Sequence, residues 1–146
     1  MSTSINPSRN TVEGTRGVFL TIMAVLIAIL AVSDFTKALQ HIRDPNNLGL
    51  VILGIRLDTV GTNIVGGNLF GLMLATYAFG IWRMRSWVLP LSMAYAFYVP
   101  INLTLFWFLH IGQRPSVGFI LVYLAVSLTG SVGTALYLAY HHDRLG

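Results

Sequence analysis

The chain has no cysteine among its 146 residues, and it has few charged residues. The first absence excludes disulfides, thiol nucleophiles and metals bound by cysteine. Charged residues make up 10% of the sequence, whereas ordinary soluble domains contain about 25%. Hydrophobic residues make up 55%, and the mean hydropathy is +0.71. A soluble protein of this composition would lack the polar surface to cover itself, so the composition indicates a membrane protein.

The sequence also lacks the motifs of the common enzyme classes. It contains no Ser-His-acid set, no H-E-x-x-H motif, no glycine-rich phosphate loop after a strand, and no pair of carboxylates within one apolar run. The net charge of +4 is spread over short segments, and none of them is long enough to follow a phosphate backbone. We therefore expect no nucleic-acid partner. The sequence favours a protein that is not an enzyme, and it identifies no cofactor.

Apolar residues instead form four long runs that are separated by short charged segments. The runs cover residues 18–39, 61–82, 87–109 and 117–140. Each reaches the roughly 20 residues that an α-helix with a rise of about 1.5 Å per residue needs to cross the hydrocarbon layer. We predict an all-α polytopic membrane protein, with four transmembrane helices in an up-down bundle. Residues 16–142 form this single domain, between a flexible tail at 1–15 and a short tail at 143–146.

The distribution of arginine and lysine predicts the orientation, because basic residues accumulate on the cytoplasmic side. Four spans put five basic residues on the side of the termini: Arg9, Arg16, Arg83, Arg85 and Arg144. The other side carries four: Lys37, Arg43, Arg56 and Arg114. The two arginines between Trp82 and Trp87 resemble a tight cytoplasmic turn with tryptophans at the membrane interface. We therefore predict that both termini are cytoplasmic.

The segment before the second span is too apolar to be a simple loop. From Leu48 to Trp82 the chain is apolar almost throughout, and as one helix it would be about 52 Å long, too long for a bilayer. We predict a separate short helix at 48–57. Two interpretations remain open for it: an interfacial helix that covers the outer end of the bundle, or a re-entrant lid over a cavity.

Small residues form stripes in the second and fourth runs. The glycines of these stripes are Gly66, Gly67, Gly71, Gly130 and Gly133. Small residues let two helices approach closely in lipid, where van der Waals contacts hold them together. We predict that these glycines pack helices within the bundle. Two alternatives are a contact between copies of the chain and a groove in which a flat ligand approaches the backbone.

Polar residues in or beside the apolar runs are the candidate functional residues, because lipid makes them costly. Those predicted near the outer half are Arg56, Asp58, Asn63, Asn68, Tyr98, Asn102 and His110. They form either interhelical hydrogen bonds or an outward-facing cavity for a small or lipid-like molecule. His41 and His110 could meet as a haem or metal pair. We expect no metal site, since no third ligand is spaced near either histidine.

The region from residue 56 to residue 87 resembles small bacterial four-span proteins loosely called DoxX-like. The likeness rests on a short helix followed by Arg56-Leu57-Asp58, on Gly66, Gly67, Gly71 and Gly80, and on the Arg83-Met84-Arg85 turn. This resemblance implies an up-down four-helix bundle in a bacterial cytoplasmic membrane. It implies hardly any chemistry, because those families mostly lack an assigned activity.

The sequence leaves three classes of function open. The first is a non-enzymatic integral membrane protein that binds a small apolar or lipid-like molecule, or serves as an accessory subunit of a membrane complex. The second is a small transporter or channel built from an oligomer of this chain. The third is a membrane enzyme that acts on a lipid or a quinone. The expected partners are the lipid bilayer and either further copies of the chain or a larger complex.

Overall fold

Helices dominate the computed structural model, which describes residues 17–44, 50–109 and 117–146. In chain order the elements are α1 (Val18–Phe35), α2 (Lys37–Arg43), β1 (Val51–Ile52), β2 (Ile55–Arg56), α3 (Val60–Trp82), α4 (Val88–Leu109) and α5 (Val117–Tyr140), followed by a 3-10 turn at His142–Arg144. By length and composition, α1, α3 and α4 can each cross a membrane. The structure is therefore that of an integral membrane protein with an almost entirely helical fold.

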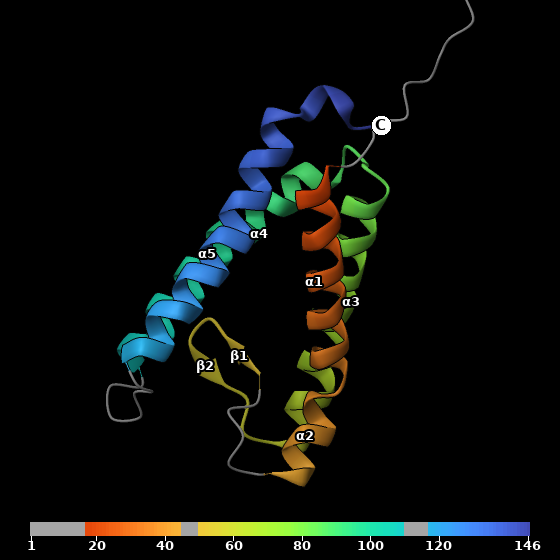
Figure 1. The fold of residues 1–146 in the computed structure, drawn as a ribbon. Coiled ribbons are helices and arrows are strands. Elements are labelled where there is room, and N and C mark those ends of the chain that lie inside the picture. The colour runs from red at the N-terminus through yellow and green to blue at the C-terminus, as the bar shows by residue number, and fades with distance from the viewer. Residues whose placement is uncertain (1–16, 45–49, 110–116) are drawn as a thin grey trace, which may run out of the picture.

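The long helices alternate in direction and pack as two pairs, α1 with α3 and α4 with α5 (Figure 1). The two pairs lie close together at the end that carries the turn between α3 and α4, which we call the turn end. There the backbone N–H of Gly146 donates to the carbonyl of Met84 at 2.8 Å, and the N–H of Ser86 donates to the carbonyl of Gly146 at 2.9 Å. The pairs diverge toward the opposite end, the hairpin end, where β1 and β2 lie between them (Figure 1).

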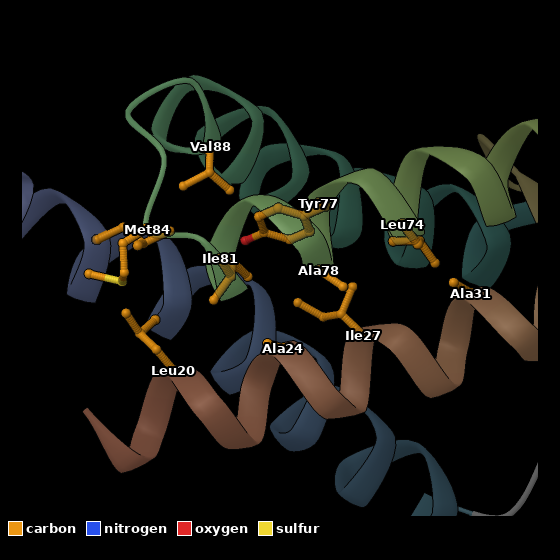
Figure 2. Close-up of a cluster of buried hydrophobic side chains, with 11 residues drawn as sticks. Leu20, Ala24, Ile27, Ala31, Leu74, Tyr77, Ala78, Ile81, Met84 and Val88 are labelled. Carbon is orange, nitrogen blue, oxygen red and sulfur yellow. The ribbon is translucent and has the colours of Figure 1, made fainter. Parts of the chain in front are cut away.

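The pair α1–α3 forms the main apolar core (Figure 2). Side chains spaced three or four residues apart face the partner helix, which is the periodicity of one helical face. From α1 these are Leu20, Ala24, Ile27 and Ala31, and from α3 they are Leu74, Tyr77, Ala78 and Ile81. Met84 and Val88 extend the core around the turn end, next to Leu138 of α5. The alanines allow the two backbones to approach closely, and van der Waals contacts then hold the helices together in lipid.

The first apolar run is helical but not continuous. The structure interrupts it at Thr36, between α1 and α2, whereas the sequence predicted one span over 18–39. The Thr36 hydroxyl donates to the carbonyl of Ser33 at 2.9 Å, and the Gln40 side-chain amide donates to this hydroxyl at 2.9 Å. Threonine hydroxyls that bond back to the preceding turn bend helices. The bent run then continues as α2 beside α3 to Arg43.

The predicted short helix at 48–57 is wrong for the described residues of that segment. Residues 51–56 form a β-hairpin in which Val51 pairs with Arg56 and Ile52 pairs with Ile55. Its two turn residues, Leu53 and Gly54, both have positive φ, 49° and 76°. This geometry matches the tight turns that join antiparallel strands. β-Branched residues on both sides of the turn favour strands, and a short apolar run of this kind does not by itself distinguish helix from strand.

Candidate functional site

Asn63, on the first turn of α3, holds both ends of the hairpin segment. Its side chain is 1% exposed. The amide oxygen accepts a hydrogen bond from the backbone N–H of Leu50 at 3.0 Å, and the amide nitrogen donates to the carbonyls of Leu57 at 2.6 Å and Thr59 at 2.9 Å. The backbone N–H of Leu57 also donates to the carbonyl of Leu50 at 2.9 Å. All three contacts of this amide go to the chain's own backbone, so Asn63 acts as a clamp at the base of the hairpin.

Asn102, on α4, holds the tip of the same hairpin. Its amide oxygen accepts a hydrogen bond from the backbone N–H of Gly54 at 2.9 Å. Its amide nitrogen donates a longer one, at 3.4 Å, to the carbonyl of Val51. A Cβ atom at Gly54 would lie 2.7 Å from the backbone of Leu105, so the turn also touches α4 directly. A larger residue at position 54 would meet both this contact and the unfavourable positive φ. The two asparagines therefore attach the hairpin to two different helices.

Apolar side chains fill the remaining space between the hairpin and α3. A Cβ atom at Gly66 would lie 2.6 Å from the side chain of Leu57, 3.1 Å from that of Leu50 and 3.7 Å from that of Ile52. The missing side chain at Gly66 thus creates the seat for the hairpin segment. Two of the polar residues predicted to line an outer cavity, Asn63 and Asn102, are thus bonded to the hairpin segment of the protein's own chain.

The charged residues of the predicted site form an ion pair at the edge of the hairpin. Nε of Arg56 lies 3.0 Å from Oδ1 of Asp58. The two side chains differ in exposure, 21% for Arg56 and 71% for Asp58. The pair lies just before α3, so its charges flank the start of an apolar helix.

Tyr98 belongs to a row of aromatic rings between α3 and α4. Its ring centroid is 5.4 Å from that of Phe70 and 6.3 Å from that of Tyr95. Tyr95 in turn lies 5.7 Å from Tyr77. Tilted or offset rings at these separations stabilise the contact between two elements. The row accounts for part of the packing between the two helix pairs.

The other predicted residues are not part of this cluster. Asn68 is exposed on α3, so the structure does not bring it together with Asn63 and Asn102. His110 lies outside the described residues. A Cβ at Gly67 would collide with the backbone carbonyl oxygen of Asp34, and one at Gly71 would lie 3.0 Å from the ring of Phe35. These two glycines therefore lie in the close contact between α3 and the end of α1.

The glycines of α5 have looser surroundings. A Cβ at Gly133 would lie 3.7 Å from the ring of Phe19, which is an ordinary contact. At Gly130, no atom of the described chain lies within 4 Å of such a Cβ. The two predicted glycine stripes therefore differ: the α3 stripe has close neighbours within the chain, whereas Gly130 faces open space.

An apolar groove between α1 and α3 is the feature that sequence reasoning missed. Its volume is about 660 Å³. The lining residues are Ala24, Val25, Ala28, Ile29, Ala31, Val32 and Phe35 of α1, with Ala75, Ala78, Phe79 and Trp82 of α3. Alanines form the floor, and larger side chains form the walls. The signal in the sequence is alanine repeated on one stripe of the first run, whereas the predicted stripes were defined by glycine in the second and fourth runs.

The groove extends over half of the membrane-spanning length. One end lies at Trp82, the last residue of α3, and the other at Phe35, whose ring packs at Gly71 in the middle of α3. The stretch of α3 between these points is about 16 Å long at the helical rise per residue. The hydrocarbon core of a bilayer is about 30 Å thick. The groove thus matches the length of one leaflet and ends at the turn end of the molecule.

No protein-family model matches this chain, and no curated protein or solved structure matches it. The resemblance to DoxX-like proteins therefore remains a prediction from the sequence.

Proposed function

We propose that this chain is a non-enzymatic integral membrane protein that holds the apolar chain of a lipid-like molecule in the groove between α1 and α3. The observation that carries the proposal is the groove itself, which is lined by apolar residues and has a volume of about 660 Å³. Ligand-binding pockets typically measure about 300–1,000 Å³ and have mostly apolar linings. The groove therefore has the size and the chemistry of a site for a hydrocarbon chain.

The arrangement of the amides supports the groove over the predicted outer cavity as the binding site. The amides of Asn63 and Asn102 already bond to the hairpin backbone. A ligand at that position would have to displace the hairpin and leave its backbone groups unpaired, which is costly in lipid. Binding in the groove requires no such displacement.

The membrane arrangement that goes with this function has four spans, with α5 as the fourth. This helix has 24 residues, and its part Leu124–Tyr140 is apolar. We place the turn end of the molecule on the cytoplasmic side of a bacterial inner membrane. Three arginines lie at this end, Arg83, Arg85 and Arg144, and basic residues accumulate on the cytoplasmic side.

A second candidate function, a small oligomeric transporter or channel, is favoured by Asn68. Its amide is exposed on α3, between the exposed residues Val65 and Leu69. An amide exposed to lipid is costly, and amides can hydrogen-bond between membrane helices. In this alternative a second copy of the chain, or a subunit of a larger complex, covers Asn68.

The proposal can be tested with a phosphatidylcholine that carries a photoreactive diazirine in one acyl chain. The protein is reconstituted in nanodiscs with this probe, illuminated and digested, and the crosslinked peptides are mapped by mass spectrometry. Ala28 is exposed and lines the groove, so Ala28→Phe should fill the groove without disturbing the core. Ala94→Phe makes the same change at an exposed alanine of α4 outside the groove and serves as the control.

We expect crosslinks concentrated on peptides of α1 and α3, and we expect Ala28→Phe to reduce them while Ala94→Phe leaves them unchanged. Crosslinks spread evenly over all lipid-facing helices would contradict the proposal. So would a pattern that Ala28→Phe does not alter. A mass of two or more chains per nanodisc in the native state would favour the oligomeric alternative.

A further inference from the structure

The mouth of the groove at the turn end carries a positive charge held in place by the groove wall. The guanidinium carbon Cζ of Arg83 lies 5.5 Å from the ring centroid of Phe79. Phe79 is one of the groove-lining residues, and Trp82, the residue before Arg83, is another. A cation over an aromatic face is attracted by the ring's electrons and loses some of its freedom. The charge therefore lies directly beside the opening rather than at an arbitrary point of the membrane surface.

This charge is available to a ligand. Arg83 and its neighbour Arg85 are both exposed. In the described part of the chain, the observed ion pairs join Arg56 to Asp58 and His142 to Asp143, and neither involves an arginine of the turn. Arginine stays protonated at any physiological pH, and its planar fork of donors suits phosphate oxygens. The mouth of the groove is thus complementary to an anionic phosphate.

We propose that the groove and Arg83 together form a binding site for an anionic phospholipid of the leaflet at the turn end. One acyl chain lies along the alanine floor from Trp82 toward Phe35, and the phosphate accepts hydrogen bonds from the Arg83 guanidinium. This inference rests on the proposed function, since it names the lipid class for the same groove.

The length and the position of the groove agree with this occupant. From its mouth to Phe35 the groove covers about 16 Å, the depth of one leaflet. Trp82 marks the level of the interface, where tryptophan side chains prefer to lie. The charge at that level selects a headgroup with net negative charge over a zwitterionic one, because the positive end of a zwitterion would be repelled by Arg83 and Arg85. A second copy of the chain would offer the groove apolar side chains but would not explain the exposed arginine at its mouth.

The test compares two acyl-diazirine probes with identical chains, phosphatidylglycerol and phosphatidylcholine, in nanodiscs of otherwise equal composition. Crosslinking to α1 and α3 peptides is measured for the wild-type protein, for Arg83→Gln and for Arg144→Gln. The control removes the same charge from another exposed residue at the turn end. Thermal unfolding of each variant in nanodiscs checks that the fold is retained.

We expect the wild-type protein to prefer the phosphatidylglycerol probe by about fivefold, the effect of one basic residue on an anionic lipid. Arg83→Gln should remove most of this preference, and Arg144→Gln should retain it. Equal crosslinking by the two probes would overturn the choice of an anionic lipid while the groove function stands. Equal losses in the two variants would also overturn it, because the preference would then reflect overall charge. Absence of groove crosslinks with either probe would overturn both proposals.

Discussion

Two faces of α3 differ in how the chain uses them. On the face toward the hairpin, Asn63 bonds to three backbone groups and Gly66 receives the side chains of Leu57 and Leu50. On the face toward the groove, Phe79 and Trp82 border an open apolar space. The first face is covered by the hairpin through polar and apolar contacts, and the second is apolar and open. Polar residues in an apolar run therefore do not by themselves indicate a ligand site, because the amides of Asn63 and Asn102 bond to the chain's own backbone.

The physical reason lies in the solvent. A backbone group without a hydrogen-bond partner costs several kcal/mol in hydrocarbon. An irregular segment such as the hairpin is therefore stable there only if other parts of the protein supply partners for its backbone groups. The two asparagines meet this need at the base and the tip of the hairpin. An open apolar groove carries no such cost, because lipid chains can enter it. The four predictions below test this division between the two faces, from the largest effect to the smallest.

Asn63→Leu should have the largest effect on stability. The substitution leaves the N–H of Leu50 and the carbonyl of Leu57 without their amide partner in a buried site, whereas the carbonyl of Thr59 keeps the backbone N–H of residue 63 as donor. Each unpaired buried group costs about 1–3 kcal/mol, so we expect a loss of about 3 kcal/mol or more. Reversible unfolding in mixed micelles, followed by circular dichroism, measures it. A change below about 1 kcal/mol would show that the hairpin does not depend on this clamp.

Gly67→Ala tests the close approach of α1 and α3. The new methyl group would collide with the carbonyl oxygen of Asp34, and backbone atoms yield less easily than a flexible side chain. Overpacking of this kind typically costs about 1–3 kcal/mol, and we expect about 2 kcal/mol. Gly61→Ala is the matched control on the same helix, because a methyl group there meets no atom of the described chain within 4 Å. Equal stability of the two variants would contradict the close crossing at Gly67.

Asn102→Leu should loosen the hairpin more than it destabilises the whole protein. It removes the acceptor of the Gly54 N–H and the donor to Val51 at the tip, while the base remains clamped by Asn63. We expect a loss of about 1–2 kcal/mol, together with faster amide hydrogen exchange at residues 51–56. Exchange measured by mass spectrometry resolves this segment. Unchanged exchange at Gly54 would mean that the tip does not rely on α4.

The sequence predicted the helices well and the hairpin poorly. The helices α3 and α4 begin within one residue of the predicted runs, because long apolar segments bounded by charged turns leave little choice in lipid. The segment after residue 50 is apolar too, and its conformation depends on amides that lie far along the chain. Asn102 is 48 positions from the Gly54 amide that it binds, so no local pattern reveals the hairpin.

The candidate site was predictable only in part. Asn63 and Asn102 stood out because amides in apolar runs are rare, and both do form buried or half-buried contacts. Their amides have a structural role, because they are hydrogen-bond partners of backbone groups in the hairpin segment. The groove could not be read from the sequence, because an alanine stripe packs a core as readily as it forms a floor. The structure shows both outcomes, because Ala24, Ala31 and Ala78 belong to the core between α1 and α3 and also line the groove.

Asn68→Leu should have the smallest effect, and it separates an exposed amide from the amides that hold the hairpin. Asn68 has the same chemistry as Asn102 but is exposed, so its removal leaves no hairpin group unpaired. We expect a change within about 0.5 kcal/mol in a monomeric preparation, as for other surface substitutions. If unfolding at increasing protein-to-lipid ratio shows that the wild-type protein gains stability and Asn68→Leu does not, then Asn68 bonds between copies of the chain. A loss above about 1 kcal/mol at high dilution in lipid would instead show that the amide has a partner within one chain, and the contrast between Asn68 and the asparagines that hold the hairpin would then fail.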